Sequence, residues 1–132
     1  MKGSAGSVFS TVTESSKTQA DRLLHVILDS LEDSKAEDIV SIDIEGKSAL
    51  GDYMVIVSGR SNRHVTAICD HLIRDMKANG VKDIRVEGLN HGDWVLIDTG
   101  DIIIHVFRPE MREFYNIEKM WMVPDIEDET FH

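Results

Sequence analysis

Residues 51–72 read GDYMVIVSGRSNRHVTAICDHL, and much of the architecture follows from this stretch. Its start, residues 53–57, is a short apolar run rich in β-branched residues, which predicts a central strand buried on both faces. Ser61 is a preferred N-cap residue, and the apolar residues after it fall on one helix face until Asn79 and a following glycine end the helix. Residues 84–87 predict the next strand, so the whole segment indicates a β-α-β crossover with two parallel strands.

The segment upstream of this crossover predicts one helix and one strand. Apolar residues recur at helical spacing over residues 23–31, and Thr18 opens a motif that resembles a capping box. The helix is therefore expected to begin at Thr18 and to end near Ser34. Residues 38–44, DIVSIDI, alternate apolar and polar side chains as a half-buried strand does.

The downstream segment predicts two more strands and a closing helix. Residues 94–98 and 101–107 are apolar strands separated by a Thr-Gly pair, which is typical of a tight hairpin. Pro109 suits the first position of a helix, and the chain after it predicts one or two short helices up to residue 121. The expected fold class is therefore α/β, with a mixed five-stranded sheet flanked by helices.

Length and composition fit one folded unit. The chain has 132 residues, and we expect a disordered leader at residues 1–17, a domain at residues 18–122 and an acidic disordered tail at residues 123–132. No stretch approaches the ~18 apolar residues of a membrane span, and residues 1–16 lack the apolar core of a secretion signal. A cytoplasmic protein without a membrane partner is therefore expected. Cys69 is the single cysteine, which excludes an internal disulfide.

The charge of the chain indicates a class of partner. The formal net charge is −10 at pH 7. An acidic domain is repelled by phosphate backbones, so binding to free DNA is not expected. A basic protein surface would instead be attracted.

Several residue groups are capable of chemistry, and each has a structural alternative. Asp98 and Asp101 flank the hairpin turn, where two carboxylates could hold a metal or share acid–base work, but aspartate also caps turns, and that role is favoured. Gly59 and Ser61 could cradle a phosphate, although helix capping is favoured there. The histidines lack a zinc-ligand set and are interpreted as surface or packing residues, and Cys69 is predicted to be a core residue. No catalytic residue, metal ligand or cofactor is therefore assigned.

The most unusual composition lies between residues 107 and 122. Charged side chains alternate there with aromatic and methionine side chains, as in an interface with apolar anchors inside a polar rim. The alternative is a closing helix whose aromatic residues cover the sheet, and the sequence favours neither interpretation over the other. Trp94, which opens a strand after a polar loop, is a second candidate anchor.

Two long segments resemble the Iojap family of ribosome-silencing factors. They are residues 51–72, quoted above, and residues 87–121, EGLNHGDWVLIDTGDIIIHVFRPEMREFYNIEKMW. The resemblance runs in order over residues 18–121, with a departure at Gly51, where the family commonly has serine. It implies a bacterial or organellar protein that binds the large ribosomal subunit through ribosomal protein number fourteen, a basic protein on the intersubunit face. Bound there, such a protein sterically blocks joining of the small subunit and represses translation when nutrients are limited.

The resemblance also implies a nucleotidyltransferase-like topology. Enzymes of that fold need an Asp-x-Asp pair on the strand after the helix to hold magnesium, whereas residues 85–87 of this chain read RVE. A positive charge at a ligand position opposes Mg²⁺ binding. The alternative hypothesis is a nucleotide-binding or nucleotidyltransferase-like enzyme that uses Gly59, Ser61, Asp98 and Asp101.

The candidate partner-binding residues divide into three groups. The apolar anchors are Trp94, Phe114 and Tyr115. The acidic residues expected to face lysines and arginines of the partner are Asp93, Asp98, Asp101, Glu110 and Glu113. The basic residues expected to meet partner carboxylates or ribosomal RNA are Arg108 and Arg112. A third hypothesis is a homodimer that uses the same aromatic C-terminal segment.

Overall fold

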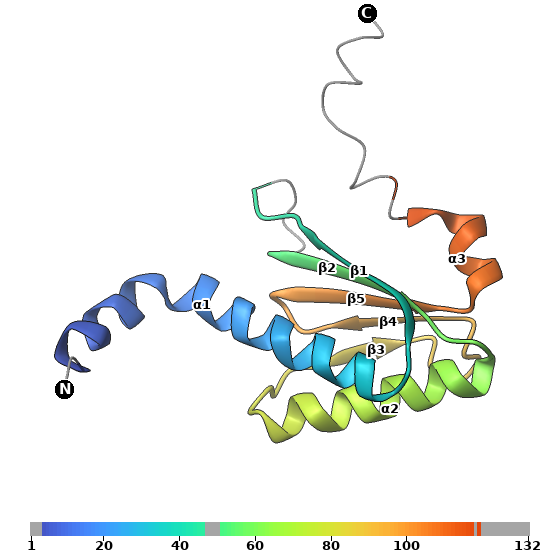
Figure 1. Ribbon diagram of the computed structural model, residues 1–132, viewed down its shortest axis with the longest axis horizontal. Coiled ribbons are helices and arrows are strands. Elements are labelled where there is room, and N and C mark those ends of the chain that lie inside the picture. The colour runs from blue at the N-terminus through green and yellow to red at the C-terminus, as the bar shows by residue number, and fades with distance from the viewer. Residues whose placement is uncertain (1–3, 47–50, 118, 120–132) are drawn as a thin grey trace, which may run out of the picture.

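The computed structural model describes residues 4–46, 51–117 and 119, and its helices and strands follow the predicted order (Figure 1). Within those residues, no helix has the length and apolar composition needed to cross a membrane. The elements in chain order are α1 (Ser4–Asp33), β1 (Glu37–Asp43), β2 (Tyr53–Ser58), α2 (Asn62–Ala78), β3 (Arg85–Glu87), β4 (Trp94–Asp98), β5 (Ile102–Phe107) and α3 (Pro109–Tyr115).

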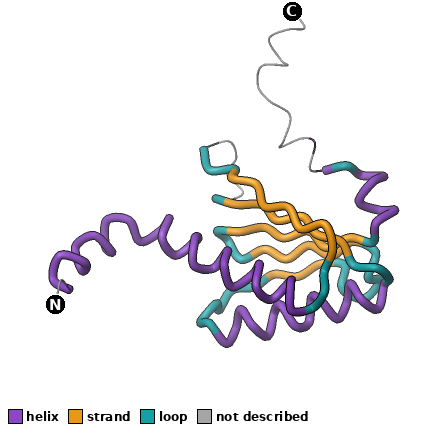
Figure 2. The backbone as a smooth tube through the Cα atoms, in the orientation of Figure 1, coloured by secondary structure: helices purple, strands orange, loops and turns teal. Residues whose placement is uncertain are grey.

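The five strands form one mixed sheet in the order β1-β2-β5-β4-β3, so the predicted fold class is confirmed (Figure 2). β2 pairs with β5 in parallel, from Tyr53 beside Ile102 to Ser58 beside Phe107. The pairs β1–β2, β4–β5 and β3–β4 are antiparallel. β2 and β3 therefore run in the same direction, as the predicted crossover requires, but β5 and β4 lie between them.

Alternate side chains of the sheet enter two separate apolar clusters, because successive residues of a strand point to opposite faces. On one face, α1 and α2 lie side by side and cover the larger cluster (Figure 1). On the opposite face, a smaller cluster contains Met54, Ile56 and Phe107, with Trp94 of β4 and Met111 of α3 packed against it. The second face carries the site described below, at the end of β5 where α3 begins.

The first helix is longer than predicted. It begins at Ser4, so the predicted start at Thr18 is wrong, whereas its end at Asp33 agrees with the prediction. The helix crosses residue 17, where a disordered leader was expected to end. No glycine or proline occurs from residue 7 to residue 33. Because extending an existing helix costs far less than nucleating one, the helix continues backward from its packed half.

The second helix has the caps that the sequence predicts. Ser61 is its N-cap, and the His64 backbone N–H donates to Ser61 Oγ over 3.1 Å. At the other end, the Asn79 backbone N–H donates to the Asp75 carbonyl over 3.1 Å. Cys69 lies fully buried on the apolar stripe, where burial raises the pKa of its thiol to about 12. Its predicted core role is therefore confirmed.

The predicted hairpin and closing helix are both present. β4 and β5 are joined through a tight turn, and Pro109 opens α3. The helix ends at Tyr115 because Asn116 adopts a left-handed conformation with φ of 50°. Beyond it, the structure describes residues 117 and 119, and most of the predicted continuation to residue 121 and the acidic tail lie outside the described residues.

Candidate partner-binding surface

Aromatic side chains gather where β5 meets α3. Trp94, the first residue of β4, pairs with Phe107, the last residue of β5, and their rings stack with centroids 5.0 Å apart. The Tyr115 ring lies 4.6 Å from the Trp94 ring, and Phe114 meets Tyr115 edge to face at 5.0 Å. Trp94, Phe107, Phe114 and Tyr115 form the aromatic cluster.

The aromatic cluster changes from buried to exposed along its length. Phe107 is fully buried, Trp94 is half-buried, Tyr115 is 45% exposed and Phe114 is 76% exposed. Among the residues that the structure describes, Phe114 and Tyr115 are the large hydrophobic side chains that are exposed. The closing-helix interpretation holds for Met111, which packs on the sheet, whereas Phe114 is left uncovered on the outside of the helix.

His105 lies beside Trp94 on the same face of the sheet. The indole Nε1–H of Trp94 donates to His105 Nδ1 over 3.0 Å. His105 is 7% exposed, and this burial lowers its pKa to about 4. The ring is therefore neutral at pH 7, with Nδ1 accepting and the proton on Nε2. Sequence reasoning interpreted His105 as a surface or packing residue and missed this contact, which the alternation along β5 and the hairpin register could have indicated.

Polar contacts fix the loop before β4 to the start of α3. Arg108 Nε donates to Asp93 Oδ1 over 2.9 Å, and Arg108 Nη1 donates to Glu110 Oε2 over 3.0 Å. Asp93 Oδ1 also accepts from Asn62 Nδ2 over 2.6 Å, which adds the start of α2. Asp93 and Arg108 were predicted to contact a partner, but their charged atoms already bind residues of this domain.

Arg112 is also engaged within the domain. Its Nη1 donates to the Asp38 carbonyl over 2.7 Å and to the Ser58 hydroxyl over 2.8 Å. Because Ser58 is buried at the end of β2, these contacts tie α3 to the sheet. Of the charged residues predicted on α3, Glu110 and Glu113 are the ones that are exposed.

Two glycines set the path of the chain into Trp94. Gly88 has φ of +86°, and a Cβ added there would lie 2.3 Å from the Trp94 carbonyl oxygen. Gly92 has φ of +72°, and a Cβ there would lie 2.8 Å from the Asn62 carbonyl oxygen. Glycine is favoured at both positions because the positive φ suits it and because a larger residue would place its Cβ too close to a carbonyl oxygen. The sequence predicts a loop here, but it does not show these close approaches.

Asp98 and Asp101 lie at the opposite end of the β4–β5 hairpin from the aromatic cluster. At about 3.4 Å per residue, the length of these strands separates the two ends by about 17 Å. Asp98 Oδ1 accepts from the Gly100 backbone N–H over 2.8 Å, so the favoured turn role is confirmed for Asp98. The predicted acidic set is therefore divided between two ends of the sheet.

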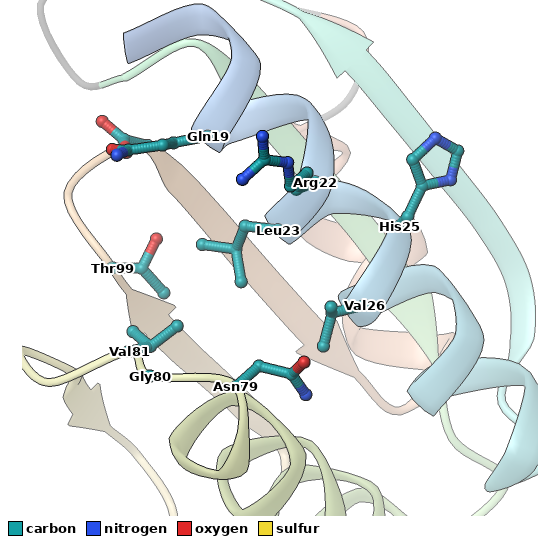
Figure 3. A pocket seen from close by; sticks show the side chains of 10 residues that line it. Gln19, Arg22, Leu23, His25, Val26, Asn79, Gly80, Val81 and Thr99 are labelled. Carbon is teal, nitrogen blue, oxygen red and sulfur yellow. The ribbon is translucent and has the colours of Figure 1, made fainter. Parts of the chain in front are cut away.

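An open groove of about 650 Å³ lies at the turn end (Figure 3). It is bounded by α1, the loop after α2 and the β4–β5 turn, and Asp101 contributes to its lining. Figure 3 shows Leu23 of α1 pointing into the groove, with Val81 and Thr99 on the opposite wall. Within the described part of the chain, no group of three or more His, Cys, Asp or Glu side chains converges as metal ligands would.

The residues of the nucleotidyltransferase-like alternative do not converge. Gly59 and Ser61 follow the end of β2 that lies beside Phe107, where the Gly59 N–H donates to the Phe107 carbonyl over 2.9 Å. Asp98 and Asp101 lie at the other end of the sheet, by the hairpin turn. One active site could not use both pairs, so the residue set of this alternative is wrong.

Comparisons with known proteins give a consistent set of relatives. The family model described as "Ribosomal silencing factor during starvation" matches residues 17–131. A ribosomal silencing factor from Zymomonas mobilis is 50% identical over 109 residues, which cover 83% of this chain and 82% of that protein. One from Haemophilus influenzae is 38% identical over 99 residues, which cover 75% of this chain and 97% of that protein. A crystal structure of a Chromobacterium violaceum protein is 36% identical with a TM-score of 0.74, covering 76% of this chain and 84% of that one.

Proposed function

Because the chain belongs to the family of ribosomal silencing factors, we propose that it is a non-enzymatic module that binds the large ribosomal subunit. Bound there, it sterically blocks joining of the small subunit and represses translation when nutrients are limited. Its direct partner is ribosomal protein number fourteen, the basic protein that the family resemblance implies.

The aromatic cluster is the observation that supports this proposal most. It presents Phe114 and Tyr115 to the outside on a helix that Arg112 ties to the sheet. An anchor that is already fixed in position loses little conformational entropy when a partner binds. A few aromatic anchors of this kind typically carry most of the binding energy of an interface. We therefore assign Trp94, Phe114 and Tyr115 to the centre of the contact.

Exposed carboxylates beside the cluster suit a basic partner. Glu110 and Glu113 are exposed on α3, next to the aromatic pair. Together with the net charge of −10, they attract a positive surface over long distances. Rim charges raise the association rate and set the orientation of the partner more than they raise affinity. Glu110 and Glu113 are therefore assigned to the rim of the contact.

The remaining predicted residues take other roles in this proposal. Asp93, Arg108 and Arg112 hold α3 and the loop before β4 in place, because their charged atoms bind residues of the domain. They therefore act on binding through the position of the aromatic cluster and not through ribosomal RNA. Asp98 and Asp101 lie outside the central contact, at the turn end of the hairpin.

Sedimentation of purified ribosomal subunits through a sucrose gradient tests the proposal. Large and small subunits are mixed with and without the protein at fixed salt and magnesium concentrations. The protein should comigrate with the large subunit, and the peak of joined ribosomes should fall. A double variant, Phe114→Ala with Tyr115→Ala, should lose both effects, whereas Asp101→Ala serves as the matched control at the other end of the sheet. An unchanged joined peak with the protein at the top of the gradient would refute the proposal.

Self-association is the competing use of the aromatic cluster. Light scattering coupled to sizing, over a range of protein concentrations, measures the oligomeric state of the wild type and of Phe114→Ala. If Phe114→Ala converts a dimer to a monomer and leaves subunit binding unchanged, the exposed aromatic pair is a dimer contact. The assignment of Phe114 to the ribosomal contact would then be wrong.

A further inference from the structure

We propose that His105 is a positioning residue for partner binding, which holds the Trp94 indole, and through it Tyr115, in the orientation that the partner meets. The inference rests on the proposed function, because it concerns the same surface. It assigns a role to a side chain that is itself too buried to contact the partner extensively.

The contact between His105 and Trp94 has the geometry of an orienting hydrogen bond. The donor–acceptor distance is 3.0 Å, and the two ring planes are inclined by 36°. The indole N–H is only a donor, so rotation of a half-buried Trp94 away from His105 would leave that N–H without its acceptor. The hydrogen bond therefore favours one orientation of a large ring that could otherwise turn about its side-chain bonds.

His105 is itself held firmly. Its ring stacks on Phe107 with centroids 5.9 Å apart and planes inclined by 10°. Phe107 is fully buried in the second apolar cluster. The order of contacts thus runs from the fixed Phe107 through His105 to Trp94, and from Trp94 to the exposed Tyr115.

Packing alone does not account for a histidine at this position. Its neighbours on the same face of β5, Ile103 and Phe107, are apolar and buried, and a buried imidazole costs desolvation that an apolar side chain avoids. Burial keeps the pKa of His105 at about 4, so Nδ1 remains an acceptor at neutral pH. Its hydrogen bond to Trp94 offsets the cost of burying this polar ring.

The test combines substitutions of both partners. His105→Leu removes the acceptor, His105→Asn retains an acceptor near the Nδ1 position, and Trp94→Phe removes the donor but retains an aromatic ring. Should the leucine variant fail to fold, His105→Phe is a second variant without an acceptor. Large-subunit affinity is measured for each single variant and for the double variant. The indole N–H resonance of Trp94 is recorded in parallel, with Trp121→Phe used to assign the two tryptophans of the chain.

The proposal predicts a specific pattern of affinities. His105→Leu should weaken binding roughly three- to tenfold, which corresponds to one orienting hydrogen bond, and His105→Asn should restore most of it. In the Trp94→Phe background, His105→Leu should have no further effect, because the contact is already absent. An equal loss in both backgrounds, or a loss with asparagine as large as with leucine, would mean that His105 acts through packing, and the proposal would be overturned.

The resonance measurement separates this inference from the proposed function. If the wild type does not bind the large subunit, the proposed function fails, but the free protein still reports on Trp94. An indole N–H resonance that shifts or broadens in His105→Leu, and recovers in His105→Asn, would still support positioning. A resonance that is unchanged in every His105 variant would overturn it, whatever the ribosomal result.

Discussion

The two ends of the β4–β5 hairpin each carry an aspartate beside a strand terminus, but the contacts of these aspartates differ. Asp98 accepts from the backbone N–H of Gly100, two residues along the chain. Asp93 accepts from Arg108 and Asn62, which lie 15 and 31 residues away. A local contact of the first kind stabilises a turn, whereas contacts of the second kind fix separate elements relative to one another. Asp93 therefore joins separate elements at the end of the sheet where α3 begins, whereas Asp98 contributes to its own turn.

The two ends also differ in shape. The end at α3 presents Phe114 and Tyr115 of the aromatic cluster outward, whereas the turn end is hollowed into the groove lined by Asp101. Projecting aromatic anchors suit insertion into a pocket of a partner. If this difference is functional, perturbations of equal severity at the two ends should have unequal effects on binding.

Of the changes considered, acidification should lower the stability of the folded protein most. The pKa of His105 is about 4 in the folded protein and 6.5 for an unperturbed histidine, so the unfolded chain takes up the proton first as the pH falls. The stability that a neutral His105 provides is complete above pH 6.5 and is lost as the pH falls toward 4, by about 3 kcal/mol. Denaturant unfolding of the wild type and of His105→Asn between pH 7.5 and pH 4 measures this loss. A stability difference between the two proteins that does not change with pH would contradict it.

Trp94→Ala should show most clearly that the two ends of the hairpin contribute unequally to binding affinity. Removing a central aromatic anchor should weaken binding to the large subunit more than tenfold, whereas Asp101→Ala at the turn end should change affinity by less than about twofold. Equilibrium sedimentation or surface-based binding measures both, after circular dichroism has shown that each variant is folded. Equal losses at the two ends would place the contact elsewhere or spread it over the whole sheet.

Arg112→Met tests whether the α3 end depends on long-range contacts. The variant keeps an unbranched stem but removes the donors to the Asp38 carbonyl and the Ser58 hydroxyl, so it should lower the free energy of unfolding by about 1–2 kcal/mol. Thermal or denaturant unfolding measures the change. Arg74→Met, at an exposed position on α2, is the matched control and should stay within about 0.5 kcal/mol of the wild type. Similar losses in both variants would show that the contacts of Arg112 contribute nothing specific.

Asp98→Ala should have the smallest effect. It removes the acceptor for the Gly100 N–H and should cost about 0.5–1 kcal/mol of stability without changing subunit binding. Asp98→Asn keeps an acceptor and should lie between the wild type and Asp98→Ala in unfolding experiments. A loss of subunit binding in a folded Asp98→Ala variant would mean that the turn end of the hairpin is part of the contact surface.

Local features of the fold could be predicted from the sequence, because their causes lie within a few residues. Ser61 caps α2 through the N–H of His64, three residues on, and the tight turn fixes the register of β4 against β5. The place of β5 between β2 and β4 could not be predicted, because strand adjacency depends on packing between distant segments. The length of α1 was also missed, because a polar sequence without breakers allows a helix but does not mark its start.

The candidate site was predicted in part. The aromatic composition after residue 107 and Trp94 identified side chains that do lie together, from Trp94 to Tyr115. Sequence could not distinguish Arg108 and Arg112, which bind within the domain, from charges that remain exposed, because the residue types are the same in both cases. His105 was missed for a related reason, since its role depends on a neighbour across the strand pair.

The contacts of Arg112 also affect when the protein becomes competent to bind. They join α3 to residues 54 and 74 positions earlier in the chain, so they can form only after the intervening residues, which include β3, β4 and β5, have been synthesised. During synthesis, β1 and β2 leave the ribosome well before α3 does. A nascent chain therefore lacks a positioned aromatic pair until α3 docks, and, on the proposed function, incomplete copies would not compete with finished copies for the partner.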